Sequence, residues 1–333
     1  NTALTELYCS ENQLTSLDLS KNTALTELYC SENQLTSLDV SKNTALKELI
    51  CNYNSLTSLD LSNNTALTGL YCSGNQFASL DLSSNTALTE LFCSSNQLTY
   101  LDLSNNPVLT SVICDINKLT SLDVSNNTAL TELSCYKNQL TYLDVSKNTA
   151  LTKLSCGANQ LTSLDVSNNT ALIELSCSKN QLTSLDLSNN TALDTLWCYD
   201  NKLTSLDLSN NVALTTVVFY ENTYVITLTD NTFDLSTLPA GFDISKASEW
   251  TNGTVKGNIL TVEDASEWVT YKYDCGNGHS ETFTLVPQIE EEITSVEINE
   301  TNFPDENFRE YVKSSFDKDG DGVLSAEEIA AVT

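Results

Sequence analysis

The sequence predicts a curved, parallel β solenoid of short 21-residue coils, followed by a small all-β module and a C-terminal helix–loop–helix segment. A phrase running from Leu4 to Leu14 recurs every 21 residues from the first residue to about Asn222. Its cysteine forms a column without insertion or deletion, at positions 9, 30, 51, 72, 93, 114, 135, 156, 177 and 198, and Phe219 takes the next place. A repeat this regular indicates coils that stack on one another, and its loss after Thr223 indicates a change of domain.

Composition excludes several classes of protein. Hydrophobic residues make up 40% of the 333 residues but are spread evenly over short repeats, which favours a long thin core over a single globule. With a formal charge of -29 and only 15 basic residues, the chain would be repelled by nucleic acid and by anionic membranes. No run of about 18 apolar residues occurs, so direct membrane insertion is not predicted. Because the chain begins in mid-repeat, we expect it to be part of a longer protein, with any targeting signal or anchor outside it.

Each repeat is predicted to contain one short strand with a buried face. Leu7 and Cys9 alternate with Glu6 and Tyr8, which is the two-residue period of a strand that buries one side. One such strand cannot bury its face alone. The copies must therefore stack into a parallel sheet that shares a continuous core.

The eleven cysteines are predicted to be buried free thiols. No C-x-x-C pair occurs, and the spacing of 21 fits neither a metal cluster nor an ordinary disulfide framework. Thiols in parallel strands about 4.8 Å apart would point the same way, so a bridge would force the sulfur torsion out of its usual range. Disulfides and metal binding are the less favoured alternatives. Cys275 lies outside the column near His279, and we assign this pair no role because no third partner is near in sequence.

Three polar columns are interpreted as structural. Asn occupies two of them in every copy, beginning at Asn1 and Asn12, where the turning chain leaves backbone groups to be hydrogen-bonded. The third column runs from Asp18 to Asp207. The alternation of residues 17–19 predicts a second short strand on the return side of the coil, with solvated carboxylates. The alternative is an acidic ladder that binds cations.

The repeat can be written L-x-x-L-x-C-x-x-N-x-L followed by x-x-L-D-L-S. It resembles the leucine-rich repeat at the short end of its length range, with Cys where the third Leu of the strand is expected. More narrowly, it resembles the cysteine-ladder internalins, a group of bacterial surface proteins, over roughly two-thirds of the chain. The resemblance implies a secreted or cell-surface binding protein.

The outward positions that vary between repeats are the predicted ligand-binding face. The residue before each cysteine points away from the core, onto the concave side of such an array. The apolar members of this column are the predicted ligand-binding residues Tyr8, Tyr29, Ile50, Tyr71, Phe92, Ile113 and Trp197. We expect the first five to form the main contact patch, beside an acidic column that begins at Glu6. An exposed apolar stripe indicates an interaction surface, and packing between strands is the alternative explanation.

Residues 1–222 are assigned to the solenoid, with ten Cys-containing repeats and a divergent eleventh, and residues 223–287 to a β-rich capping or immunoglobulin-like module. The open end of the array needs such a cap. Hairpins are predicted over 254–262 and 268–285. The aromatic residues predicted to form the core of this module are Phe233, Phe242, Trp250, Trp268, Tyr271, Tyr273 and Phe283.

The acidic stretch 288–300 is predicted to be a linker, or in part a last strand of the module through residues 296–298. Residues 301–333 follow as an EF-hand-like segment, expected to be truncated.

Residues 317–328 match D-x-[DN]-x-[DN]-G-x5-E over its full length and resemble an EF-hand calcium loop. The predicted calcium ligands are Asp317, Asp319, Asp321, the carbonyl of Val323, Ser325 through water, and both oxygens of Glu328. A helix is predicted before the loop, after Pro304. The alternative is an acidic turn without metal, because EF-hand loops usually pair and only one is present.

The sequence therefore predicts a monomeric, non-enzymatic binding or adhesion protein of the bacterial surface or exterior. A single His, with no recognisable nucleophile set or phosphate loop, argues against catalysis. The predicted partner is a protein or glycan on the concave face, and the predicted cofactor is calcium. Two alternatives stay open: a structural spacer without a ligand, and the non-catalytic arm of a larger enzyme.

Overall fold

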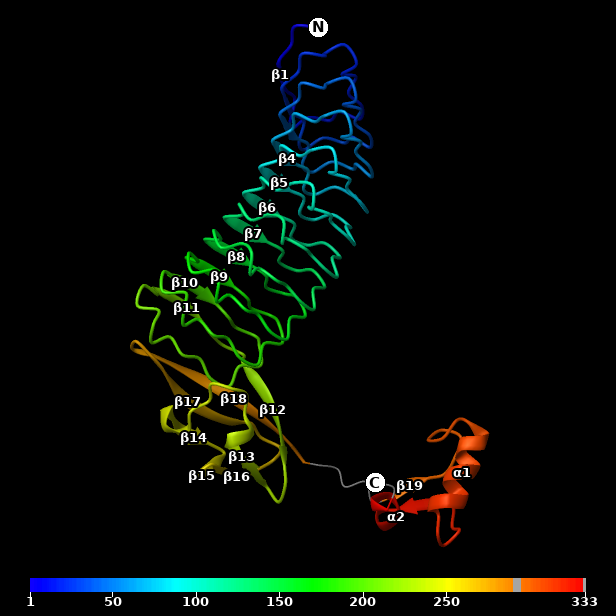
Figure 1. Ribbon diagram of the computed structural model, residues 1–333, viewed down its shortest axis with the longest axis vertical. Coiled ribbons are helices and arrows are strands. Elements are labelled where there is room, and N and C mark those ends of the chain that lie inside the picture. Colours follow the sequence, from blue (N-terminus) through cyan, green and yellow to red (C-terminus); the bar gives the residue numbers. More distant parts are fainter. Residues whose placement is uncertain (290–294, 332–333) are drawn as a thin grey trace.

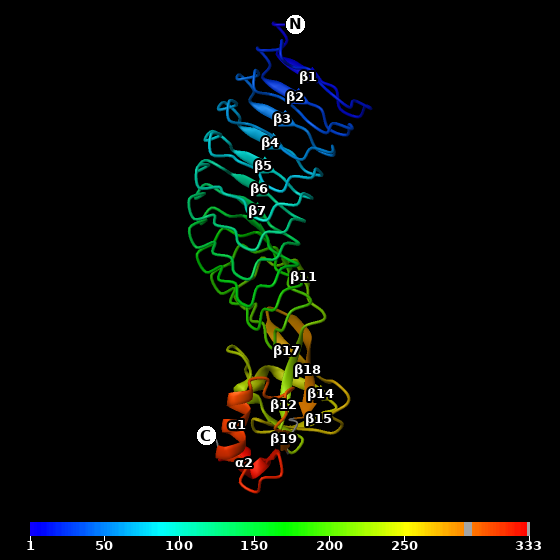
Figure 2. The ribbon, with the colours of Figure 1, turned by 90° about the vertical axis from the view of Figure 1, so that its right-hand side faces the viewer.

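In the computed structural model, residues 1–289 and 295–331 are described. Eleven short strands, one per coil, form a single parallel sheet in chain order. They are β1 (Glu6–Tyr8), β2 (Glu27–Tyr29), β3 (Glu48–Ile50), β4 (Gly69–Tyr71), β5 (Glu90–Phe92), β6 (Ser111–Ile113), β7 (Glu132–Ser134), β8 (Lys153–Ser155), β9 (Glu174–Ser176), β10 (Thr195–Trp197) and β11 (Thr216–Val218). Equivalent residues pair, so each sequence column becomes a row across the sheet. Figures 1 and 2 show the coils stacked into a long, twisted rod, which confirms the predicted parallel solenoid.

The inward Leu and Cys columns fill the interior of the rod. Leu28 and Cys30 of the second coil have no exposed surface, and their equivalents through the tenth coil are also buried. The thiols are free. Burial raises the pKa of the Cys51 thiol well above its ordinary value. These cysteines therefore pack as small neutral hydrophobic groups.

Both Asn columns hydrogen-bond the backbone of adjacent coils. Asn33 Nδ2 donates to the Cys9 carbonyl of the previous coil at 2.9 Å, and Asn33 Oδ1 accepts the Leu14 N–H at 2.9 Å. Asn43 Nδ2 donates to the Asn22 carbonyl at 2.8 Å. Buried backbone groups that the tight turns leave free are thereby paired. The structural interpretation of both columns is confirmed.

Residues 17–19 form no strand, so the prediction of a second strand on the return side is wrong. Asp18 Oδ1 instead accepts the Ser20 N–H at 3.0 Å, and the same contact recurs down the column to Asp207 and Ser209, also at 3.0 Å. An Asp that bonds the backbone two residues ahead closes a local turn. The apolar residues on either side of each Asp therefore reach the core because the chain turns, with no strand ladder.

Residues 223–289 form a small all-β module beyond the last coil (Figure 1). Its strands are β12 (Thr223–Leu228), β13 (Thr232–Asp234), β14 (Ala247–Thr251), β15 (Gly253–Lys256), β16 (Ile259–Val262), β17 (Val269–Gly276) and β18 (His279–Ile289). Two 3-10 turns, η1 (Leu235–Thr237) and η2 (Ile244–Lys246), lie between β13 and β14. The strand orders are β12-β18-β17-β14 in one sheet and β13-β16-β15 in the other. The pairs β15–β16 and β17–β18 are the two predicted hairpins.

The module packs directly against the end of the rod. Phe219 of the last coil meets Phe283 of the module with ring centroids 4.7 Å apart. The Tyr271 hydroxyl donates to the Thr204 carbonyl at 2.5 Å. The core prediction is wrong for Trp268, which is 60% exposed. Trp268 precedes β17, whose inward residues begin with Val269, so alternation directs the indole to solvent.

The C-terminal segment contains β19 (Ser295–Glu297), α1 (Glu306–Phe316), β20 (Val323–Ser325) and α2 (Ala326–Ala330). Strand β19 pairs antiparallel with β20. The suggestion that residues 296–298 add a last strand to the β module is therefore wrong, because the loop strand supplies the partner. The acidic residues 290–294 of the predicted linker lie outside the described residues. Within the described ranges, no helix has the length and apolar character needed to cross a lipid bilayer.

Candidate functional site

The outward positions of strands β1–β11 form the candidate binding face. Strands β2–β10 bury the middle residue and leave the third at least partly accessible, as at Leu28 and Tyr29, and the first residue is also accessible except at Gly69. The third residues form one continuous row, which we call the aromatic row over β1–β5. Strands β1–β7 lie side by side on one face in Figure 2.

The five residues of the predicted main contact patch are neighbours in the aromatic row. Tyr8 and Tyr29 stack with ring centroids 4.4 Å apart, and Tyr71 and Phe92 meet edge to face at 4.9 Å. Ile50 lies between the two pairs. Tyr8 is 62% exposed, whereas the other four are half-buried against their neighbours. The row is one continuous apolar surface, and its role in ligand binding stays a prediction.

Glutamates beside the aromatic row accept hydrogen bonds from its tyrosines. The Tyr29 hydroxyl donates to Glu48 Oε2 at 2.9 Å, and the Tyr71 hydroxyl donates to Glu90. Burial, together with the bond to Glu48, raises the pKa of Tyr29 well above its usual range. The tyrosines are therefore neutral and held in place from one coil to the next. This half of the face combines apolar rings with negative charge.

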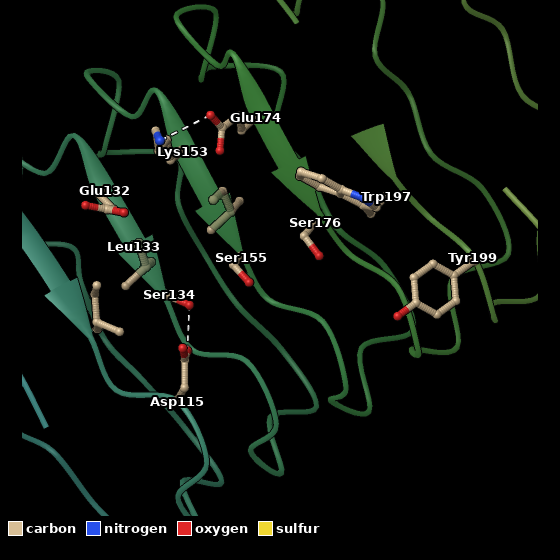
Figure 3. A pocket seen from close by; sticks show the side chains of 12 residues that line it. Asp115, Glu132, Leu133, Ser134, Lys153, Ser155, Glu174, Ser176, Trp197 and Tyr199 are labelled. Atoms are coloured by element: carbon tan, nitrogen blue, oxygen red, sulfur yellow. Dashed lines mark hydrogen bonds and ion pairs between the residues drawn. The ribbon is translucent and has the colours of Figure 1, made fainter. Parts of the chain in front are cut away.

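The row changes character after β6, where the outward side chains become small. Ser134, Ser155 and Ser176 follow one another in β7, β8 and β9. A hollow of about 460 Å³ opens above them, with Ile113 at one end and Trp197 at the other. Figure 3 shows the three serines between Asp115 and the indole of Trp197, with Tyr199 beyond it. We call this feature the serine hollow.

Charged groups at the serine hollow are paired with neighbours. Asp115 accepts the Ser134 hydroxyl at 2.5 Å and the Tyr136 N–H at 2.8 Å. Burial raises the pKa of the Asp115 carboxyl. Lys153 Nζ lies 3.1 Å from Glu174 Oε1 across adjacent strands, as Figure 3 shows. The hollow therefore presents hydroxyls and carboxylates around an aromatic wall.

The sequence prediction placed Ile113 and Trp197 on the ligand face but missed the serine hollow between them. The available signal was a run of three serines bracketed by bulky residues in one outward column. Small residues over three adjacent strands lower the surface between two higher walls. The structure brings the two predicted residues to the ends of the hollow, where Ile113 adjoins Phe92 of the aromatic row and Trp197 lies at the far end.

The predicted calcium ligands lie in the loop between α1 and α2. Single carboxylate oxygens of Asp317, Asp319 and Asp321 lie within 4.8 Å of one another. Gly320 and Gly322 donate their N–H groups to Asp317, at 2.7 Å and 3.0 Å. Converging carboxylate oxygens are the ligands that calcium prefers, so this donor set fits the ion.

The other three predicted ligands lie at the end of the loop. Val323 and Ser325 belong to β20, and Glu328 follows in α2. Glu328 accepts the Lys318 N–H at 2.6 Å and the Ser325 N–H at 2.9 Å. These bonds, the one from Ser325 first, lower the pKa of Glu328 to about 2. Glu328 therefore stays ionised and joins the two ends of the loop.

Comparison with known proteins identifies the repeats. Models of leucine-rich repeats match residues 2–43, as two copies, and residues 97–119. The comparison with curated proteins gives no match.

Solved structures extend the likeness over most of the chain. The functional domain of InlJ from Listeria monocytogenes, which includes a cysteine ladder, is 30% identical with a TM-score of 0.54, over 87% of this chain and 86% of that one. A leucine-rich repeat protein of Leptospira interrogans is 24% identical with a TM-score of 0.62, over 67% and 62% of the two chains. The ectodomain of the Arabidopsis thaliana receptor kinase GASSHO1/SCHENGEN3, solved in complex with CASPARIAN STRIP INTEGRITY FACTOR 2, is 22% identical with a TM-score of 0.57, over 68% of this chain and 34% of that one. The last two share the fold.

Proposed function

This chain belongs to the internalin-type leucine-rich repeat proteins with a cysteine ladder, and we propose that it is a non-catalytic protein-binding or adhesion protein of the bacterial surface or exterior. Stacked repeats present long surfaces suited to binding a partner. The ectodomain with the same fold was solved with a bound partner, which supports a binding role. We take the outward sheet face as the concave, partner-binding side.

The continuous aromatic row carries this proposal. Five apolar side chains in adjacent strands form an accessible surface larger than any one coil provides. Aromatic residues are favoured anchors of protein interfaces. The glutamates beside them, such as Glu27 and Glu48, favour a partner with basic groups around an apolar centre.

Substitution of the aromatic row tests the proposal. A screen of secreted proteins supplies a partner, whose affinity for the full chain is then measured by surface plasmon resonance. Changing Tyr29, Tyr71 and Phe92 together to Ser is expected to raise the Kd at least tenfold, because each change removes apolar area from the interface.

The matched control changes Tyr100 and Tyr142 to Ser. These tyrosines lie on the return side of the coils and are 63% and 66% exposed. The control is expected to bind as the parent does. An unchanged Kd for the triple variant would rule out the aromatic row, and a screen without a partner would favour the structural spacer.

We also propose that residues 317–328 bind calcium. The convergence of three carboxylates, with a fourth at Glu328 closing the loop, supports this. Asp317, Asp319, Asp321 and Glu328 would hold the ion with the Val323 carbonyl and Ser325. The bound ion would offset the repulsion between these carboxylates.

A further inference from the structure

A second row of side chains links the coils beside the outward face. It begins at Ser10, one residue after the first cysteine, and recurs every 21 residues. Ser10 Oγ accepts the Ser31 N–H of the next coil at 3.0 Å. The same contact from side-chain oxygen to N–H continues coil by coil until Asp115, which accepts the Tyr136 N–H at 2.8 Å. Each coil therefore satisfies one backbone donor of its successor.

The linkage stops at the serine hollow. The next residues in this row are Tyr136 and Gly157, and neither has an oxygen at the β or γ position. Among the described residues, the N–H groups of Gly157 and Ser178 have no acceptor within hydrogen-bonding distance. The Ser178 hydroxyl, in a residue 3% exposed, also has no partner there. Unpaired buried polar groups cost free energy and are uncommon in native proteins.

Gly157 and Ser178 are buried behind the serine hollow, and Gly157 lies beside Ser176, which lines it. A Cβ added to Gly157 would lie 3.5 Å from the Ser176 hydroxyl oxygen, which lines the hollow, and 3.0 Å from the Ser178 carbonyl oxygen. A side chain at this position would therefore crowd Ser178 and Tyr136 and press on Ser176 in the wall of the hollow. In the first six coils the equivalent residue is Ser, Asn or Asp and supplies a side-chain oxygen.

The walls of the hollow add a complementary set of groups. Trp197 supplies a flat aromatic surface at one end, and Asp115 a carboxylate at the other (Figure 3). The hydroxyls of Ser155 and Ser176 lie between them. A fitting ligand needs an apolar face to stack on the indole, and polar groups that both donate and accept.

We infer that the serine hollow is a binding subsite for a neutral saccharide. A sugar ring has a C–H face that can stack on Trp197 and hydroxyls that can bond both serines and carboxylates. The charge of the chain, -29, disfavours anionic ligands. The pairing of Lys153 with Glu174 leaves the middle of the hollow without a free cation for them.

The subsite deepens the proposed binding function but uses residues outside the aromatic row. Its test is titration calorimetry of the full chain with N-acetylchitohexaose, cellohexaose and maltohexaose. At least one probe is expected to bind with a Kd near the millimolar range or tighter. Trp197→Ala is expected to weaken that binding at least tenfold.

Gly157→Ser is the sharper variant. Its Cβ would lie 3.0 Å from the Ser178 carbonyl oxygen and 3.5 Å from the Ser176 hydroxyl oxygen, so the added side chain displaces Ser176 in the wall of the hollow. Binding is expected to fall several-fold while the protein stays folded by circular dichroism. Tyr100→Ser, on the return side, and Tyr29→Ser, in the aromatic row, are expected to bind the probe as the parent does.

Two results would overturn the inference: no binding of any probe by the parent protein at millimolar concentration, or unchanged affinity after Trp197→Ala. Loss of probe binding in Tyr29→Ser would move the subsite to the aromatic row. If the hollow instead receives a side chain of a protein partner, no saccharide probe would bind. Trp197→Ala would then lower the affinity for that protein partner. Failure of the subsite leaves the triple-variant test of the aromatic row unaffected.

Discussion

Two aspartates in adjacent coils show how position on the coil sets the charge state of a residue. Burial beside the serine hollow raises the pKa of Asp115 above its ordinary value of 3.8. Asp102, exposed on the return side, has a lowered pKa because the Ser104 hydroxyl and N–H stabilise its carboxylate. The two groups therefore contribute to stability with opposite dependence on pH.

Asparagine substitutions are expected to reveal the opposite signs. A raised folded pKa means that the contribution of Asp115 to stability is full below pH 3.8 and is lost as pH rises through the folded pKa. The free energy of unfolding of Asp115→Asn should therefore rise relative to that of the parent as pH goes from acid to neutral. The rise should be under about 1 kcal/mol because the carboxyl group is partly solvated.

Asp102→Asn is the matched control. The Asp102 carboxylate stabilises the folded protein above pH 3.8, and this stabilisation is lost as pH falls through the lowered pKa of the folded state. This variant should therefore lose stability at neutral pH and match the parent in strong acid. Denaturant unfolding of both variants at several pH values measures the two trends. Parallel trends for the two variants would contradict this assignment.

At the residue scale, the sequence identified the buried columns better than the functional ones. Leu28, Cys30 and Asn33 belong to columns whose period fixes both strand and turn, so their burial was predictable. The serine hollow depends on side-chain volumes in five adjacent strands. The unpaired N–H of Ser178 depends on the residue 21 positions earlier. Neither is visible in one repeat alone.

At the element scale, the C-terminal loop joins two helices and two strands through a few acidic residues. Ser325 and Glu328 cap α2 reciprocally, and Glu328 also accepts the Lys318 N–H at the start of the loop. Strand β20 within the loop pairs with β19. We therefore expect any ion held by the loop to stabilise both α2 and the β19–β20 pair.

Calcium titration of the full chain by calorimetry tests this element. The parent protein should bind one calcium ion, and Glu328→Gln should weaken binding at least tenfold because it removes a carboxylate and its charge. Glu327→Gln is the control, since Glu327 is exposed and occupies a motif position that carries no predicted ligand. No heat of binding by the parent protein would favour an acidic turn without metal. Equal loss in both variants would point to general charge effects.

Elements were predictable where local pattern alone defines them. The strands β1–β11 and both hairpins follow from alternation and turn residues. The return side at residues 17–19 shares the same alternation, but Asp18 bonds its own backbone and a turn results. The partner of β19 was not predictable because pairing with β20 joins segments separated by α1.

At the scale of the whole molecule, the rod offers two long sides with different chemistry. The outward sheet face carries the aromatic row and the serine hollow. The return side carries the solvated Asp column, with Tyr100 and Tyr142 among its exposed aromatic residues. The β module covers the C-terminal end, where Leu208 donates its N–H to the Cys275 carbonyl at 2.7 Å. Because the two sides differ in chemistry, we expect a partner that binds along the rod to contact only one of them.

Hydroxyl-radical footprinting of the full chain, with and without its protein partner, tests most directly which side of the rod binds the partner. Tyrosines report on both sides, and Tyr8 and Tyr100 are exposed to nearly the same extent, 62% and 63%. Binding on the sheet face predicts that oxidation of Tyr8, Tyr29 and Tyr71 falls several-fold on complex formation, while oxidation of Tyr100 and Tyr142 stays unchanged. Protection of Tyr100 and Tyr142, with Tyr8 still oxidised at its free rate, would contradict it.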